Sequence, residues 1–157
     1  MGCFCGGDKA MTDAEHQAII KLASAARTAL ESLVPGNDSM FRTFPFGTCG
    51  PAAELVGRVL AERLGLTSLY VCGSDHPDLA ANQSHAWTEV GPFIVDLTHD
   101  QFASTGVAGW VILSSSKWHE RFREKNRRIG FCMPSGWPMY PHRAYRAIVA
   151  QLDAEMQ

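Results

Sequence analysis

The 157-residue chain lacks several features that would place it in a specialised class of protein. No apolar run approaches the ~18 residues that a membrane-spanning helix requires. Neither sign of charge prevails: 14 basic and 16 acidic residues leave a net charge of −2, so no broad attraction to nucleic acid is expected. The N-terminus has no basic region followed by an apolar stretch, so no secretory signal is predicted.

The chain also has few cysteines, and they form no regular pattern. The five stand at positions 3, 5, 49, 72 and 132, an odd number with irregular spacing. This argues against a disulfide framework and favours reduced thiols in a cytoplasmic protein. One of these thiols is therefore a candidate nucleophile. The length and the 46% hydrophobic content predict one domain with its own hydrophobic core.

Apolar periodicity and end signals predict four helices. A capping box of Thr12 and Glu15 begins the first helix, and Pro35-Gly36-Asn37 ends it. Pro51 suits the first turn of the second, over 50–64, and Gly65 suits its end. A basic helix is predicted over 117–130, with Trp118, Phe122 and Ile129 on its inner face, and a last helix over 142–155.

Strand composition occurs over 67–73, on both sides of a Gly91-Pro92 turn, and over 109–114. Helices that come first, followed by neighbouring antiparallel strands, indicate an α+β fold in which the N-terminal helices pack on a small sheet. We expect residues 1–11 to form a mobile tail and residues 12–157 to form a single domain.

Cys49 stands where the second helix is predicted to begin. The free N–H groups and the dipole of a helix N-terminus favour a thiolate, and the same N–H groups can hold an oxyanion. Gly47, Gly50 and Ala52 leave room for a substrate. Taken alone, a cysteine at a helix start is more often a buried residue that packs as a small hydrophobe.

His85 and Asp96 lie on the two strands that the Gly91-Pro92 turn joins. A two-residue turn pairs residue 90 with 93 and residue 87 with 96, which puts Asp96 on the face of His85, about 7–8 Å away along the diagonal. A turn one residue longer or shorter would reverse the face. A carboxylate within "FIVDLT" is half-buried and needs a partner, and an imidazole would supply one.

The combination of Cys49, then "HAWTEV" from His85, then "VDLT" around Asp96 resembles the transglutaminase-like branch of the papain-like cysteine enzymes. The resemblance covers residues 44–102 and implies a papain-like catalytic domain. It further implies a catalytic triad in which Cys49 is the nucleophile, His85 the general base and Asp96 the group that orients it. The chain departs from the papain pattern before Cys49, where Thr43 and Phe44 stand in place of a glutamine that would stabilise the oxyanion.

The resemblance implies a thiol-dependent hydrolase or acyltransferase that acts on a peptide or glutamine amide through a thioester on Cys49, without metal or organic cofactor. A protein or peptide is the expected substrate, and Trp87 and Phe46 are expected to wall the site. Protease and deamidase activities both fit. An amine-transferring transglutaminase and a non-catalytic interaction domain of the same fold remain alternatives.

The N-terminus "MGCFC" is similar to the acylation signals of proteins that carry myristate on Gly2 and palmitate on nearby cysteines. The usual Ser or Thr at position 6 is replaced by Gly6. Acylation of Gly2, Cys3 and Cys5 would give a weak membrane association, as in an effector delivered into a host cell. A tail without function is the alternative.

Overall fold

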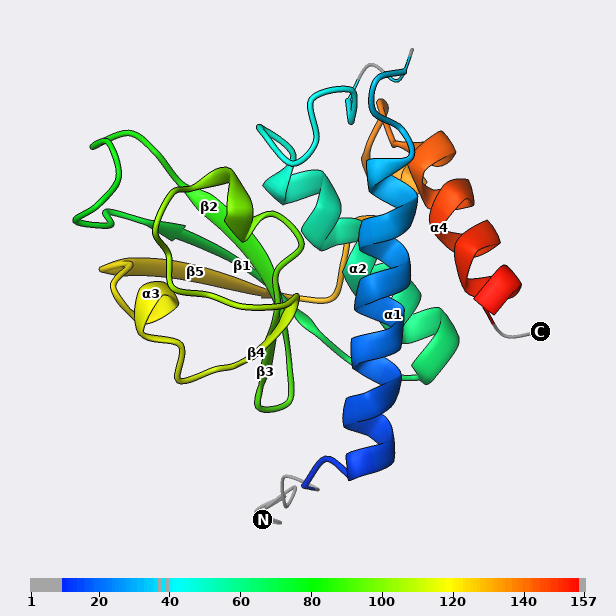
Figure 1. Ribbon diagram of the computed structural model, residues 1–157, viewed down its shortest axis with the longest axis horizontal. Coiled ribbons are helices and arrows are strands. Elements are labelled where there is room, and N and C mark those ends of the chain that lie inside the picture. The colour runs from blue at the N-terminus through cyan, green and yellow to red at the C-terminus, as the bar shows by residue number, and fades with distance from the viewer. Residues whose placement is uncertain (1–9, 37, 39, 156–157) are drawn as a thin grey trace, which may run out of the picture.

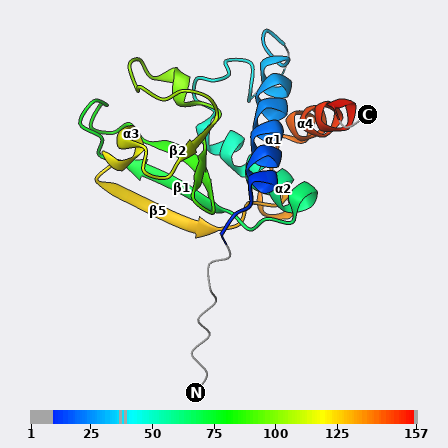
Figure 2. The same ribbon diagram turned by 60° about the horizontal axis from the view of Figure 1, so that its bottom comes forward.

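Five strands in the described part of the chain form one antiparallel sheet. The computed structural model describes residues 10–36, 38 and 40–155. Within them the strand order is β4-β3-β2-β1-β5, and Figure 2 shows β5 along one edge. The strands are β1 (Leu69–Ser74), β2 (His85–Val90), β3 (Phe93–Val95), β4 (Val111–Leu113) and β5 (Glu124–Ile129).

The three long helices gather on one side of this sheet (Figure 1). They are α1 (Asp13–Glu31), α2 (Cys49–Leu64) and α4 (His142–Glu155). The predicted capping box is present, since the Glu15 N–H donates to Thr12 Oγ1 and the Thr12 N–H donates to Glu15 Oε1. At the other end of α2, Gly65 adopts the left-handed conformation, with φ of 65°. The α+β prediction is confirmed at this level.

Each face of the sheet carries its own apolar cluster because side chains alternate along the strands. Val90, Phe93 and Val95 face the helices and belong to the main core. Val71, Trp87 and Ile94 face the opposite way and pack with Trp118 and Phe122, which come from the segment around α3 (Lys117–Glu120). The single-turn helices η1 (His99–Gln101) and η2 (Pro134–Gly136) complete the elements of the described residues.

The predicted basic helix over 117–130 is wrong beyond its first turn. Only α3 is helical, and the charged part of the segment forms β5. Arg127 and Arg128 are neighbours and so point to opposite faces of the strand, where they pair with Glu89 and Glu54 respectively. Ile129 is 75% exposed rather than buried.

Other boundaries shift by a few residues. The first helix ends at Glu31, and a turn occupies 32–36. Met11, which the sequence assigns to the tail, packs against the main core. The predicted acylation site at Gly2, Cys3 and Cys5 lies outside the described residues. No helix within the described residues has the length and apolarity needed to cross a membrane.

A buried arginine of α1 fixes the segment that follows β3. The Arg27 guanidinium donates to the Leu97 carbonyl at 2.7 Å and to both carboxylate oxygens of Asp100 at 2.9 Å. It also lies over the rings of Phe44 and Trp110, 4.6 and 4.3 Å from their centroids. Because its side chain is only 10% exposed, this charge depends on these partners rather than on water.

We therefore expect Arg27→Met to lower the free energy of unfolding by about 2 kcal/mol, because it leaves Asp100 and the Leu97 carbonyl without their donor. Urea denaturation followed by tryptophan fluorescence measures the change. Arg121→Met is the control: Arg121 pairs with Asp78 at the surface, both about half exposed, and its loss is expected to cost less than about 1 kcal/mol. Equal effects of the two substitutions would contradict the role assigned to Arg27.

Candidate active site

Cys49 is the first residue of α2, and it meets the sheet at the start of β2. The helix packs on the face that carries Ala86 and Thr88, since Thr88 Oγ1 donates to the Ala53 carbonyl at 2.8 Å. The last pair between β2 and β3 joins Thr88 to Val95. Beyond that pair the Ala86 N–H has no partner on β3 and donates to the Cys49 sulfur. The Gly50 N–H donates to the same sulfur. The thiol is thus placed beside the first residues of β2.

The predicted register of the two strands is confirmed from Val90 and Phe93 to Thr88 and Val95, but the ladder ends there, so the predicted pair of residues 87 and 96 is not formed and Asp96 follows β3 directly. Val90 lies opposite Phe93, so the Gly91-Pro92 turn has two residues, and Gly91 supplies the positive φ, 54°, that such a turn needs. His85 and Asp96 consequently lie on the same face. His85 Nε2 is 2.7 Å from Asp96 Oδ2, and both side chains are fully buried.

The contact between His85 and Asp96 determines which nitrogen faces the thiol. Asp96 Oδ2 accepts a hydrogen bond from His85 Nε2–H, so Nδ1 is the nitrogen left for Cys49. Gln101 lies on the same side, with its amide nitrogen 3.4 Å from Nδ1. The arrangement places Cys49, His85 and Asp96 in one line of polar contacts, with Nδ1 positioned to exchange a proton with the sulfur.

The electrostatics of the thiol favour its ionised form. Burial raises the pKa of Cys49, but the hydrogen bond and the charge of His85, with the backbone N–H groups of Ala86 and Gly50, outweigh it. The net result is a pKa below the ordinary value of 9.0. A lowered thiol pKa is the property that distinguishes a reactive cysteine from a structural one.

The imidazole and the carboxylate stabilise each other's charge. Burial alone would lower the pKa of His85, but the Asp96 charge and hydrogen bond raise it to about 9, with a smaller contribution from Cys49. Burial would likewise raise the pKa of Asp96, and the charge of His85 and the hydrogen bonds of His119 and His85 hold it well below its ordinary value. Together they keep Asp96 ionised and His85 protonated near neutral pH.

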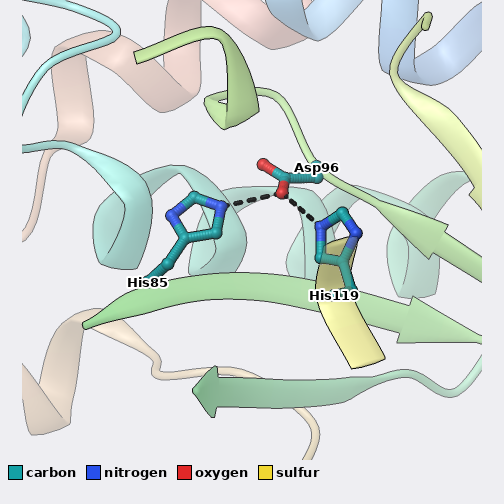
Figure 3. Close-up of side chains that lie close together, drawn as sticks. All are labelled: His85, Asp96 and His119. Atoms are coloured by element: carbon teal, nitrogen blue, oxygen red, sulfur yellow. Dashed lines mark hydrogen bonds and ion pairs between the residues drawn. The ribbon is translucent and has the colours of Figure 1, made fainter. Parts of the chain in front are cut away.

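His119 is a member of this site that the sequence did not reveal. It comes from α3, and its Nε2 lies 2.8 Å from the same Asp96 Oδ2 (Figure 3). Its Nδ1 is 2.8 Å from Ser116 Oγ. The remaining oxygen, Asp96 Oδ1, accepts from the Thr98 N–H at 3.0 Å. His119 thus supports the carboxylate from the side opposite to His85.

One nitrogen each of His85 and His119 and one carboxylate oxygen of Asp96 lie within 4.8 Å of one another. This is close enough for the three residues to be considered as ligands of a metal ion. Their spacing fits hydrogen bonds better. Both imidazole nitrogens lie under 2.9 Å from one oxygen, whereas tetrahedral ligands about 2.0 Å from zinc are about 3.3 Å apart. A cation would have to spread the three groups and break both hydrogen bonds.

The two residues predicted to wall the site are in very different places. Phe46 is 59% exposed in the loop before α2 and is free to contact a substrate. Trp87 is 1% exposed, and its ring packs edge-on against His119 with centroids 4.8 Å apart. It therefore lies under the site and offers no surface to a substrate in this structure.

No family model matches the chain, and no curated protein or solved structure matches it either. A thiol with a lowered pKa faces an imidazole that is itself held by a buried carboxylate. Such a set of groups can ionise a sulfur, form a covalent intermediate and return a proton to a leaving group.

The pKa of His85 should depend on the charge of Asp96. In a Cys49→Ala background, where no thiol shares the proton, we expect the imidazole of His85 to titrate above 6.5. With Asp96→Asn added, burial acts without the opposing charge, so the pKa should fall below 6.5. Histidine NMR titration measures both values, with His85→Gln to assign the signal. An unchanged midpoint in the Asn variant would contradict the assigned cause.

Proposed function

We propose that the protein is a cysteine-dependent enzyme that cleaves a peptide or carboxamide bond through a thioester on Cys49. The observation that carries this proposal is the contact of Cys49, at a helix N-terminus, with the nitrogen of His85 that Asp96 leaves free. Residues of these three types, held in this order, perform acyl transfer in many unrelated proteins. We also propose that the core is papain-like, with the helix of the nucleophile packed against the sheet that carries the base.

The reaction divides into two steps. The Cys49 thiolate adds to the carbonyl carbon, and the tetrahedral oxyanion then collapses as the C–N bond breaks. His85 Nδ1 gives its proton to the departing nitrogen, which leaves as an amine or as ammonia. In the second step His85 takes a proton from water, hydroxide attacks the thioester, and the carboxylic acid and the thiol are released. Asp96 holds the imidazole in the required tautomer throughout.

Two further features support this role. The two donors at Oδ2 and the Thr98 N–H at Oδ1 leave Asp96 little freedom to turn away from His85. An exposed Phe46 three residues before the thiol fits a substrate that carries an apolar side chain.

Alkylation by iodoacetamide tests whether Cys49 is ionised by His85. We expect its rate to rise with a midpoint below pH 9.0, and to exceed the rates of Cys72 and Cys132 in the same chain. His85→Gln keeps most of the volume but not the charge of the imidazole, so burial is opposed only by the backbone N–H groups of Ala86 and Gly50 and the midpoint should rise. At pH 7 the rate should then fall at least about tenfold, since each pKa unit removes about nine-tenths of the thiolate.

The control for this substitution is His142→Ala, which removes an exposed histidine at the start of α4 and should leave the rate unchanged. Peptide mass spectrometry assigns the label to each cysteine. A wild-type Cys49 no faster than Cys132, or a His85→Gln variant with wild-type kinetics, would favour the non-catalytic interaction domain instead.

The acceptor of the acyl group decides the reaction type. We expect water, and therefore new protein termini, when the protein is incubated with a cell lysate, with Cys49→Ala as the inactive control. Deamidation of glutamine would instead add about one mass unit per site without a new terminus, as follows from hydrolysis of the same thioester. Mass spectrometry of intact proteins and of their termini separates these outcomes. Cys49-dependent crosslinks without hydrolysis would show that an amine is the acceptor.

A further inference from the structure

A tyrosine of β1 reaches the first turn of the helix that carries the nucleophile. Tyr70 pairs with Thr88 in the sheet and therefore lies on the face that packs against α2. A Cβ atom placed on Gly50 would lie 3.3 Å from the Tyr70 hydroxyl oxygen. Gly50 directly follows Cys49, so the hydroxyl lies beside the backbone of the nucleophile, close to where a bound carbonyl oxygen would point.

The Tyr70 hydroxyl is a hydrogen-bond donor without an acceptor in the described part of the chain. The hydroxyls of Tyr140 and Tyr145 contact Arg58 and Glu62, respectively. The Tyr70 hydroxyl has no hydrogen-bond partner among residues 10–36, 38 and 40–155. It is also not one of the polar atoms sealed away from solvent there. A half-buried donor left open next to a reactive thiol is available to a substrate.

The ring that carries the hydroxyl is held in place from its far side. The Arg128 guanidinium lies over the ring, 4.7 Å from its centroid. Arg128 is in turn paired with Glu54, a buried residue of α2 that also accepts the Cys132 N–H. The tyrosine is thus fixed between β5 and the helix before any substrate binds, as a preorganised donor must be.

The hydroxyl also keeps its proton. Burial, with the neighbouring thiols of Cys72 and Cys49, raises the pKa of Tyr70 to about 12. It therefore remains a neutral O–H donor throughout the pH range in which the Cys49 thiolate forms.

A second donor lies next to it at the N-terminus of α2. Thr48, the residue before the helix, makes no side-chain cap, because its hydroxyl donates to the Pro45 carbonyl at 3.0 Å. Pro51 has no N–H, and the Gly50 N–H points at the Cys49 sulfur. The Cys49 N–H is thereby left without an acceptor in the described residues, which is the usual fate of the first N–H of a helix.

We propose that the Tyr70 hydroxyl and the Cys49 N–H form the oxyanion hole of the site. When the thiolate adds to a carbonyl carbon, the C=O electron pair moves onto oxygen, and these two donors stabilise the resulting negative charge. Gln101 is less suited to this task because its amide lies at His85 Nδ1, where the leaving nitrogen must receive its proton. The assignment rests on the proposed function and supplies the donor that the absent glutamine before Cys49 would provide.

The test compares two reagents that react with the same sulfur. Acylation by p-nitrophenyl acetate passes through a tetrahedral oxyanion and releases p-nitrophenolate, whereas displacement of iodide from iodoacetamide forms no oxyanion. Tyr70→Phe removes only the hydroxyl and keeps the ring under Arg128. We expect it to slow the ester burst roughly 100-fold and to leave the iodoacetamide rate within about twofold of wild type. Rates are taken on the pH plateau of each variant, with Cys49→Ala subtracted.

Tyr145→Phe is the matched control, because it removes a tyrosine hydroxyl from a helix remote from the thiol. It should change neither rate. If Tyr70→Phe leaves both rates unchanged, or lowers both equally, Tyr70 is not an oxyanion donor, while a fast wild-type Cys49 would still support the enzyme. If wild-type Cys49 reacts with neither reagent faster than Cys132, the proposed function itself fails and the oxyanion hole fails with it.

Discussion

The buried carboxylate of Asp96 is the group around which the site is organised. A carboxylate removed from water costs several kcal/mol unless donors surround it, so the fold must bring those donors to it. His85 arrives from β2, His119 from α3 and the Thr98 N–H from the segment just after β3. Three parts of the chain are therefore tied to one charge, and the loop across the outer face of the sheet is fixed by the same contacts that orient the imidazole.

The helical side of the molecule secures the same segment from behind. Arg27 reaches from α1 to the Leu97 carbonyl and to Asp100, so the backbone after Asp96 cannot move without disturbing a second buried charge. The two charges have opposite signs and lie on opposite sides of a short stretch of chain. These side-chain contacts hold the stretch in place, although its regular secondary structure is limited to the single turn of η1.

Local sequence patterns were sufficient to predict the contacts between residues on the two sides of a short turn. The even length of Gly91-Pro92 set the face of Asp96, and the capping box and Pro51 set two helix starts. His119 could not be found in this way, because its contact with Asp96 spans 23 residues and depends on how α3 packs. It lies in a segment whose charges predict a basic helix, and no motif in the sequence marks it.

The error over β5 has the same physical origin. A strand whose two faces both meet carboxylates shows no alternation of apolar and polar residues, so the period of two that identifies strands is absent. Arg127 would be exposed in a helix and is partly exposed in the strand, so its exposure does not distinguish the two. Its position is set by Glu89, which is far away in the sequence on β2. The apolar periodicity of a sequence indicates which residues are buried, but it does not indicate ion pairs between separate elements.

Among the residues that the structure describes, β5 has no strand beside its outer edge, and this has a consequence for how the protein contacts other chains. The unpaired N–H and C=O groups of an edge strand can pair with a strand of another chain, and charged side chains on edge strands commonly prevent this. Here Arg127 and Arg128 guard both faces at once, because each is drawn to a carboxylate on its own side. A strand added at this edge would be flanked by guanidinium groups above and below, so the sheet is protected against lateral growth by the same ion pairs that hold its last strand in register.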